Sequence, residues 1–466
     1  MKSFITGVGA LALCVIAGGA VALSSPEAPQ ARQATEVESS AAPATLVCGG
    51  GFERTLEEGV DVEEVDEGVS QTSWAFADPA GATILNGKQT TGLEGSPSFL
   101  TASSELVGTL SSVAPLHNVH MAGANIHIAQ AGDTRGMASN PCVSLSSDAW
   151  LVGSTTDVGT ANQLVVTNPG QTAVTVNLEA FGSVGPLDLG SHASLAVDAA
   201  STQRFDLDGV IPGDSRIALH ATTSSGADGI SLQQNSLDGA TPAGVGVITG
   251  AAAHDALTIP GVTISSEESA VAPTLRLVNP GSETATASIT LTGQDGREDL
   301  PGGSDVVVAP GSVLDLSLDG VDPGEFAVRI TGEEPLAAGV MLSSVDKKSG
   351  ARDIAWAAPT ESYTNATVMF GDVPASLGIV GESDRRIDVT VTPITADGAM
   401  GEPDKVTVAA GTYATFSVPE NCVGLTLESD EPVEAAITAA PDLAIDWMPL
   451  TSFESSRSTQ RIALSN

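Results

Sequence analysis

The sequence predicts an all-β protein in which an N-terminal apolar helix precedes tandem immunoglobulin-like β-sandwich units. Three observations lead to this fold class. One stretch of the chain occurs twice, short runs alternate between apolar and polar residues, and 50 glycines and 26 prolines among 466 residues punctuate those runs. Alternation with period two indicates strands that bury one face, and Gly/Pro clusters indicate the turns between them.

The repeated stretch runs from Leu164 to Gly213 and again from Leu275 to Gly324. Both copies open with Asn-Pro-Gly and close with Leu-Asp-Gly-Val-x-Pro-Gly, and they match at 17 of 50 positions at an offset of 111 residues. In Asn-Pro-Gly the proline fixes φ and the glycine permits a positive φ, which predicts a turn before each strand. A third, diverged copy repeats the alternation at Ile387 to Val391 but lacks Asn-Pro-Gly.

Motifs that combine Asp and Trp recur at the seams between units and contain Trp150, Trp356 and Trp447. A seam tryptophan either fills the junction between packed units or anchors a ligand. The predicted body comprises an N-terminal β segment (46–149), sandwich units one (150–253), two (254–355) and three (356–450), and a C-terminal tail (451–466). Two alternatives stay open: the units form blades or wedges of one closed assembly, or unit three borrows a strand from the first segment.

At the N-terminus, residues 1–23 contain an uncharged apolar run, Phe4 to Leu23, preceded by Lys2. About 20 helical residues can cross a bilayer core. The run is either an uncleaved signal anchor or a signal peptide with its cleavage site at Ala20–Ala22. The preceding lysine predicts that the N-terminus stays in the cytoplasm and the body lies outside. Residues 24–45, rich in Pro, Ala, Ser, Glu and Gln, are predicted to form a disordered stalk.

The chain is strongly acidic, with 57 Asp and Glu against 18 Lys and Arg and a formal net charge of −39. Cations this scarce cannot neutralise a phosphate backbone, so nucleic acid is excluded as a partner. The most acidic run, Leu56 to Val69, lacks the ligand spacing of a calcium loop and is interpreted as a solvated loop.

Two of the four cysteines, Cys48 and Cys142, bracket the first β segment. An exported chain permits a disulfide, and closure of so long a loop would stabilise the fold by roughly 4–5 kcal/mol in the chain-entropy treatment. We therefore predict that these two cysteines pair and that Cys422 is a buried thiol.

Three of the six histidines, His117, His120 and His127, lie within eleven residues and are the weak candidates for a metal site. Zinc uses such side chains. The surrounding residues favour a strand, on which His120 and His127 have opposite parity and point to opposite faces. Surface or packing histidines are therefore the competing interpretation.

No nucleophile elbow, Walker A loop, H-E-x-x-H helix or C-x-x-C pair occurs in the chain. The sequence thus predicts no catalytic residue and no cofactor. Paired carboxylates of the glycosidase type cannot be recognised in so acidic a sequence, and this keeps a hydrolase open as an alternative.

The N-terminal run, the acidic β-rich body, the stretch from Cys142 to Trp150 and the Leu-x-[Val/Leu]-x-Asn-Pro-Gly openings together resemble an actinobacterial family of secreted or membrane-anchored envelope proteins, a domain of unknown function. The resemblance covers nearly the whole chain, although the third unit departs from the Asn-Pro-Gly pattern. It implies an exported protein and a link with envelope glycan synthesis, because relatives are often encoded near a large glycosyltransferase.

We therefore expect a non-enzymatic, extracytoplasmic envelope protein that acts as a scaffold or binding module. It would be anchored by the N-terminal helix, which would be its contact with the membrane, or secreted after cleavage. The expected partner is an envelope protein or a cell-wall glycan. The alternatives are an outward-facing adhesin or glycan-binding module and a metal- or carboxylate-dependent envelope hydrolase.

Overall fold

The structure, a computed structural model, describes residues 35–37, 44–54, 67–87, 89–112, 119–211, 213–223, 228–265, 272–382, 385–453 and 460–462. In these ranges the regular elements are β-strands and one short 3₁₀ turn, η1 (Gly190–Ala193), which confirms the all-β prediction. No helix in these ranges is long and apolar enough to span a membrane. The predicted N-terminal helix, most of the stalk and residues 55–66 of the acidic run lie outside the described residues.

The described chain divides into two compact units. The smaller one contains β1 (Thr35–Val37), within the stretch predicted as stalk, and β35 (Gln460–Ile462), which pair antiparallel. The larger one, Ala42–Ser455, is called the body below.

The body contains four units, A to D, each with two layers of antiparallel strands. In units A and B the layers are separate sheets, whereas in units C and D one long strand common to both layers joins them into one connected sheet. Unit A (45–144) contains β2 (Thr45–Gly49), β3 (Ser70–Asp78), β4 (Ala82–Asn86), β5 (Gln89–Gly92), β6 (Ser98–Ala102), β7 (Val107–Ser112), β8 (His120–Ala129), β9 (Gly136–Pro141) and β10 (Val143–Ser144). Unit B (148–249) contains β11 (Asp148–Val152), β12 (Thr160–Asn168), β13 (Val174–Gly182), β14 (Gly185–Leu187), β15 (Ser194–Val197), β16 (Ser201–Asp206), β17 (Ala218–Thr223), β18 (Gly229–Asp238) and β19 (Thr241–Thr249).

Unit C (254–357) contains β20 (His254–Ile264), β21 (Thr274–Val278), β22 (Ala285–Gly293), β23 (Gly296–Asp299), β24 (Val306–Val308), β25 (Val313–Ser317), β26 (Gly324–Val345) and β27 (Arg352–Ala357). Unit D (363–449) contains β28 (Tyr363–Met369), β29 (Ala375–Gly381), β30 (Ile387–Thr395), β31 (Asp404–Val408), β32 (Tyr413–Ser417), β33 (Cys422–Ala439) and β34 (Asp446–Pro449). Two of the seams expected from the sequence, at Trp150 and Trp356, fall inside β11 and β27.

The four units share one strand order. In unit B the sheets run β11-β17-β13-β14 and β16-β12-β18-β19, and in unit A they run β2-β7-β4-β5 and β6-β3-β8-β9. In units C and D one long strand, β26 or β33, continues through both sheets in the place of the pair β17 and β18. Unit A therefore has the same architecture as the other three units, although the search for repeats in the sequence did not identify it as a copy.

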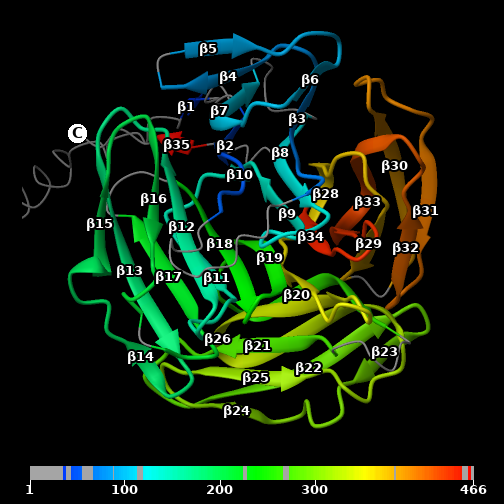
Figure 1. The fold of residues 1–466 in the computed structure, drawn as a ribbon. Helices are drawn as coiled ribbons and strands as arrows, with labels where there is room; N and C mark the ends of the chain where they lie inside the picture. The colour runs from blue at the N-terminus through cyan, green and yellow to red at the C-terminus, as the bar shows by residue number, and fades with distance from the viewer. Residues whose placement is uncertain are drawn as a thin grey trace, which may run out of the picture. The chain divides into compact units, whose positions relative to one another are not determined.

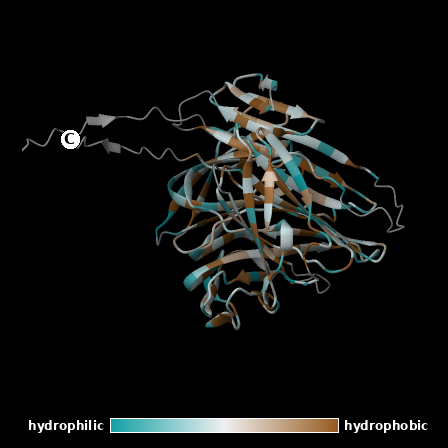
Figure 2. Cartoon of the chain, turned by 90° about the vertical axis from the view of Figure 1, so that its left-hand side faces the viewer, coloured by the Kyte–Doolittle hydropathy of each residue, from teal (hydrophilic) through white to brown (hydrophobic). Residues whose placement is uncertain are grey.

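Within a unit the two sheets pack face to face. In unit B, Leu151 and Leu178 of one sheet share a core with Leu164 and Leu232 of the other. Along β13 the predicted alternation is confirmed. Val174 and Leu178 are buried, whereas the polar residues between them are more exposed to solvent. Hydrophobic and hydrophilic bands accordingly alternate along the strands (Figure 2). Each fully buried Leu contributes roughly 1.5–3 kcal/mol relative to an exposed one.

Both Asn-Pro-Gly turns form, but the role of the glycine differs from the one predicted. Neither Gly170 nor Gly281 has a positive φ. Instead the amide of each glycine donates to the side-chain oxygen of Asn168 or Asn279, at 2.8 and 2.9 Å. A Cβ at either glycine would lie within about 3 Å of that oxygen, so the glycine permits the close approach of an Asx turn.

The units of the body close into a propeller-like ring (Figure 1). The last strands of the units, β9, β19, β27 and β34, contact one another in the middle of the ring. Trp74 and Phe76 of unit A share a core with Val368 and Leu377 of unit D, which closes the ring. Of the alternatives from the sequence, one closed assembly describes this arrangement, and the immunoglobulin-like classification of single units stays a prediction. The described strands of unit D pair within unit D.

A single carboxylate, that of Asp353 on β27, joins the four central strands. Its Oδ2 accepts from the backbone N–H of Met137 (3.0 Å) and Ile445 (2.9 Å), and its Oδ1 accepts from that of Val245 (3.2 Å). These donors belong to β9, to the residue before β34, and to β19. The side chain of Asp353 is fully buried, and burial raises its pKa to about 7 against the opposing effect of the amide donors.

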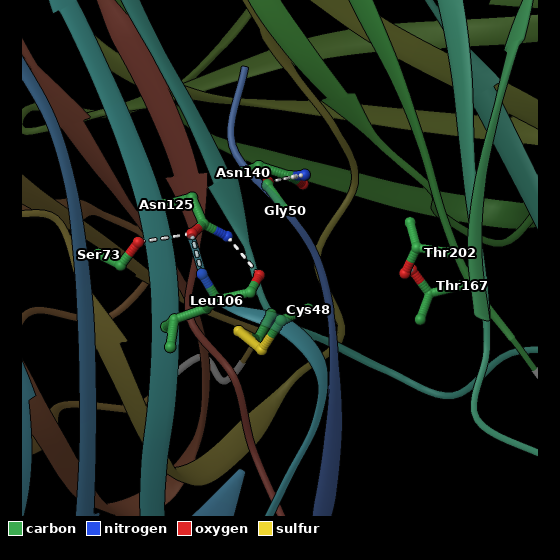
Figure 3. The surroundings of a disulfide bond; sticks show 9 residues. Cys48, Gly50, Ser73, Leu106, Asn125, Asn140, Thr167 and Thr202 are labelled. Atoms are coloured by element: carbon green, nitrogen blue, oxygen red, sulfur yellow. Dashed lines mark hydrogen bonds between the residues drawn. A yellow bond between two sulfur atoms is a disulfide. The ribbon is translucent and has the colours of Figure 1, made fainter. Parts of the chain in front are cut away.

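The disulfide joins Cys48 of β2 to Cys142, which lies between β9 and β10 (Figure 3). This is the pair expected from the sequence, and Cys422 is a buried free thiol. Beside the disulfide the Oδ1 of Asn125 accepts from Ser73 Oγ and from the backbone N–H of Leu106, both at 2.7 Å. The covalent bond and this buried network fix the two sheets of unit A to each other.

Candidate functional site

A cavity of about 470 Å³ lies where the four units of the body meet. All four units contribute to its lining. The contributing residues include Val143 and Ser144 from unit A, Asp148, Asp228, Ile230 and Thr249 from unit B, Ala256, Leu257 and Thr258 from unit C, and Tyr363, Glu434 and Trp447 from unit D. The cavity thus exists only when the ring is closed.

The acidic and basic side chains in the lining are carboxyls and one imidazole, that of His254. Exposed carboxylates of Asp148, Glu361 and Glu382 line the cavity together with the buried carboxyls of Asp228 and Glu434. No Lys or Arg belongs to the described lining. Low-dielectric walls lined by one sign of charge focus the field and favour ligands of the opposite sign.

Asp228 is held at the cavity by its own backbone. It lies just before β18 and forms an antiparallel bridge with Ser146. The backbone N–H of Asp228 donates to the Ser146 carbonyl at 2.9 Å, and the Asp228 carbonyl accepts from the N–H of Ser146 at 3.1 Å. Its side chain is 1% exposed, and neither carboxylate oxygen has a hydrogen-bond partner among the described residues. Burial raises the pKa of this carboxyl to about 6.

Glu434 enters the lining from β33, where it pairs with Val380 of β29. Its Oε2 lies 3.7 Å from the Arg329 guanidinium, and the Thr258 hydroxyl hydrogen-bonds to its carboxyl. Burial nevertheless raises the pKa of Glu434 to about 7, because desolvation outweighs the attraction of the arginine.

Further polar groups and an apolar wall complete the cavity. The hydroxyls of Thr360 and Ser452 are buried without a hydrogen-bond partner among the described residues. By contrast, the Tyr363 hydroxyl donates to the Ala435 carbonyl at 2.9 Å, and the Trp447 indole N–H donates to the Pro260 carbonyl at 2.8 Å. The two aromatic side chains are therefore fixed by hydrogen bonds, whereas the two hydroxyls and the Asp228 carboxylate are buried without a hydrogen-bond partner among the described residues.

The histidines proposed as metal ligands are not brought together. His117 lies outside the described residues. His120 and His127 are buried on opposite faces of β8, as their parity predicted: His120 contacts Thr367 Oγ1 and Glu428 Oε1, both at 3.2 Å, and His127 contacts the Thr134 carbonyl at 3.3 Å. Among the described residues no three His, Cys, Asp or Glu side chains form a group that could hold a metal ion.

Arg276 of unit C and the seam tryptophan Trp356 hold units B and C together. The guanidinium lies 4.8 Å from the centroid of the Trp356 ring and donates to the backbone carbonyls of Ser154, Ser215 and Ile217 in unit B. The Trp356 indole N–H donates to Gln234 Oε1 at 3.1 Å. This tryptophan thus fills a junction.

Trp150 belongs to a second hollow, of about 690 Å³, between units B and C. It stacks on His220 at 4.2 Å, and the two ring nitrogens of His220 contact Glu179 and Asp148 at 3.0 and 3.1 Å. Since the ring face and both nitrogens are occupied, this hollow offers a ligand less than the cavity does.

The buried acids at the cavity were missed in the sequence. A signal for Glu434 exists in the repeat, because Glu431-Pro-Val-Glu-Ala in unit D corresponds to Glu334-Pro-Leu-Ala-Ala in unit C, so that Glu434 replaces Ala337. Asp228 follows the residues Ser224-Ser225-Gly226-Ala227 in the sequence and carries no such signal, because Asp beside Ser and Gly is the usual composition of a turn.

Fold and site together define an all-β protein whose four two-sheet units close around an acidic cavity. The family model described as a family of unknown function (DUF5719) matches residues 113–419. Because this is more than half of the chain, the protein belongs to that family. No curated protein matches the chain. The match extends from the end of unit A into unit D and does not include the N-terminal apolar run.

Proposed function

We propose that the protein is a non-enzymatic binding module of the cell envelope, which works outside the cytoplasm and takes a small ligand into the cavity between units A to D. The observation that carries the proposal is the composite cavity. Four units line it and it contains a buried, unpartnered Asp228, which favours a binding site over a by-product of packing one unit.

The export of the chain rests on two supports. The Cys48–Cys142 disulfide is typical of oxidising compartments. The apolar run Phe4 to Leu23 has the composition of a signal anchor or signal peptide. An origin in actinobacteria and a partner in glycan synthesis are parts of the same proposal that rest on the resemblance alone.

The test combines compartment and occupancy. Full-length protein carrying a C-terminal tag is probed with protease on intact cells, and a tag that stays protected contradicts the export. Purified protein is then equilibrated with the small-molecule fraction of the host envelope and analysed by native mass spectrometry. Ala252→Trp, which fills the cavity, is compared with Val184→Trp, at a position 91% exposed and absent from the lining. Retention by the wild type and Val184→Trp but not by Ala252→Trp supports the proposal, and equal retention by all three contradicts it.

A further inference from the structure

The cavity contains an acid that lacks its counterpart. A buried polar group without a hydrogen-bond partner lowers the stability of the fold, and more so when it is charged. Asp228 is in this position with both carboxylate oxygens, although its backbone is fully engaged with Ser146. A ligand that donates hydrogen bonds to Asp228 would remove this cost.

The charge of the lining determines the sign of that ligand. Asp148, Glu361 and Glu382 lie on the exposed part of the lining, and Asp228 and Glu434 on the buried part. Carboxylates in such a cavity repel anions and attract cations. The Arg329 guanidinium lies 3.7 Å from Glu434 and donates to the Gly381 carbonyl. Asp228 has no such partner among the described residues.

The type of cation follows from the rest of the wall. Calcium requires about six to eight oxygen ligands and magnesium a near-ideal octahedron. Within the described ranges no three acidic or metal-binding side chains are grouped closely enough. The wall instead presents Ile230, Leu257 and Leu450, which suit an organic body. A volume of about 470 Å³ lies within the usual range for small-molecule sites.

We propose that the cavity binds a small organic molecule with a protonated amine, whose ammonium group donates to Asp228 while its body packs against the apolar wall. This inference rests on the proposed function, since it names the ligand class of the same site. The hydroxyls of Thr360 and Ser452 add acceptors and donors for polar groups on that body. Such an ammonium occurs on apolar amines and on amino sugars.

Asp228 has to be ionised to accept the ammonium, and its pKa of about 6 in the free protein sets the pH at which this happens. As the pH rises towards 6, amine affinity therefore increases by up to about tenfold per pH unit, and it levels off between pH 6 and the pKa of the amine itself, above which the ammonium is lost. A neutral ligand has no such dependence.

The test uses isothermal titration calorimetry on the full, disulfide-intact chain with two matched pairs of probes. Cyclohexylamine is compared with cyclohexanol, and glucosamine with N-acetylglucosamine. We expect each amine to bind more tightly than its neutral partner. The pair with the tighter amine indicates whether the natural source is an apolar amine or an amino sugar.

Asp228→Asn removes the charge at constant shape, and Glu361→Gln removes an exposed charge from the same lining as a control. Loss of a charged hydrogen bond is expected to weaken amine binding by roughly 10- to 100-fold in Asp228→Asn and by much less in Glu361→Gln. Thermal unfolding of Asp228→Asn at or above the wild-type temperature shows that the loss is not misfolding.

Absence of amine binding, equal binding of the neutral partners, or unchanged affinity in Asp228→Asn overturns the inference. None of these results touches the proposed function, which depends on the difference between wild type and Ala252→Trp in retaining envelope molecules. If only neutral molecules are retained in that experiment, the proposal of an amine ligand is wrong, whereas the proposal of a binding module still holds.

Discussion

The substitution Asp353→Ala tests whether one buried carboxylate holds the ring of the body closed. The side chain accepts hydrogen bonds from the backbone amides of Met137, Val245 and Ile445, which belong to three different units. Truncation leaves these three N–H groups buried without an acceptor. At about 1–3 kcal/mol for each stranded donor, the loss amounts to roughly 3–9 kcal/mol.

Relief of the buried charge offsets part of this loss. Because burial raises the pKa of Asp353 to about 7, the carboxylate is only partly ionised at neutral pH and its removal recovers only part of the desolvation cost. We therefore expect a net loss smaller than this gross figure, on the order of 3 kcal/mol, which is still a large part of the 5–15 kcal/mol that typically stabilises a folded protein.

Hydrogen exchange measured by mass spectrometry locates the effect, and denaturant titration measures its size. Peptides that contain Met137, Val245 and Ile445 should lose protection together, since the three amides share one acceptor. The control is Asp238→Ala, whose carboxylate is 82% exposed and 3.9 Å from Arg352; it should change stability by less than about 1 kcal/mol. Unchanged protection of the three peptides in Asp353→Ala would refute the role assigned to this carboxylate.

Three further outcomes are expected. Replacing both Cys48 and Cys142 with serine lowers the free energy of unfolding by about 4–5 kcal/mol in the chain-entropy treatment, because 94 residues separate them; an unchanged denaturation midpoint contradicts this. Arg276→Met costs about 3–5 kcal/mol, because it strands a carboxylate and three carbonyls in the junction of units B and C; denaturant titration measures the loss, and a value under 1 kcal/mol contradicts it. Burial raises the pKa of Asp353 to about 7 and that of Asp446 to about 8, so the stabilisation present below their ordinary value of 3.8 is lost as the pH rises through the folded values. The wild-type midpoint should therefore fall from pH 5 to pH 8, and a rise would be inconsistent with these shifts.

Local features of the fold could be predicted because they depend on neighbouring residues. The alternation at Val174 to Leu178 is a property of one strand, and it predicted the buried face correctly. The opposite orientation of His120 and His127 follows from strand parity alone. Even here the sequence did not provide the reason for the Asn-Pro-Gly turns, because the bond from Gly170 to the Asn168 side chain is invisible in a pattern that permits several turn geometries.

The closed ring and its cavity could not be predicted in the same way. Unit A shares its strand order with the other units but not a recognisable sequence, so the fourth copy appears only in the pairing of its strands. Asp228, Asp353 and Glu434 are three of 57 acidic residues. Glu434 stands out only when units C and D are aligned, Asp353 only as part of the recurring motif of Asp and Trp, and Asp228 not at all. None of these patterns shows burial, because the burial results from packing between units that are distant in the chain.

The copies of the repeat differ at the candidate site, and this difference indicates how a ring of similar units acquires a site. Four identical units would form four equivalent junctions, each filled by the same small side chains. In unit C the position is occupied by Ala337, which is 1% exposed, whereas unit D has Glu434 there and turns it toward the cavity. Glu434 does not stand alone, because the Arg329 guanidinium lies 3.7 Å from its Oε2. Unit D therefore has an acid in a largely buried ion pair at a position where unit C has a small apolar side chain. Glu434→Ala leaves the largely buried Arg329 guanidinium without its carboxylate and should therefore destabilise the body by about 3–5 kcal/mol. If the acid also serves the cavity, the same variant should retain less ligand. A variant that loses stability without any change in retention would assign Glu434 to the architecture alone.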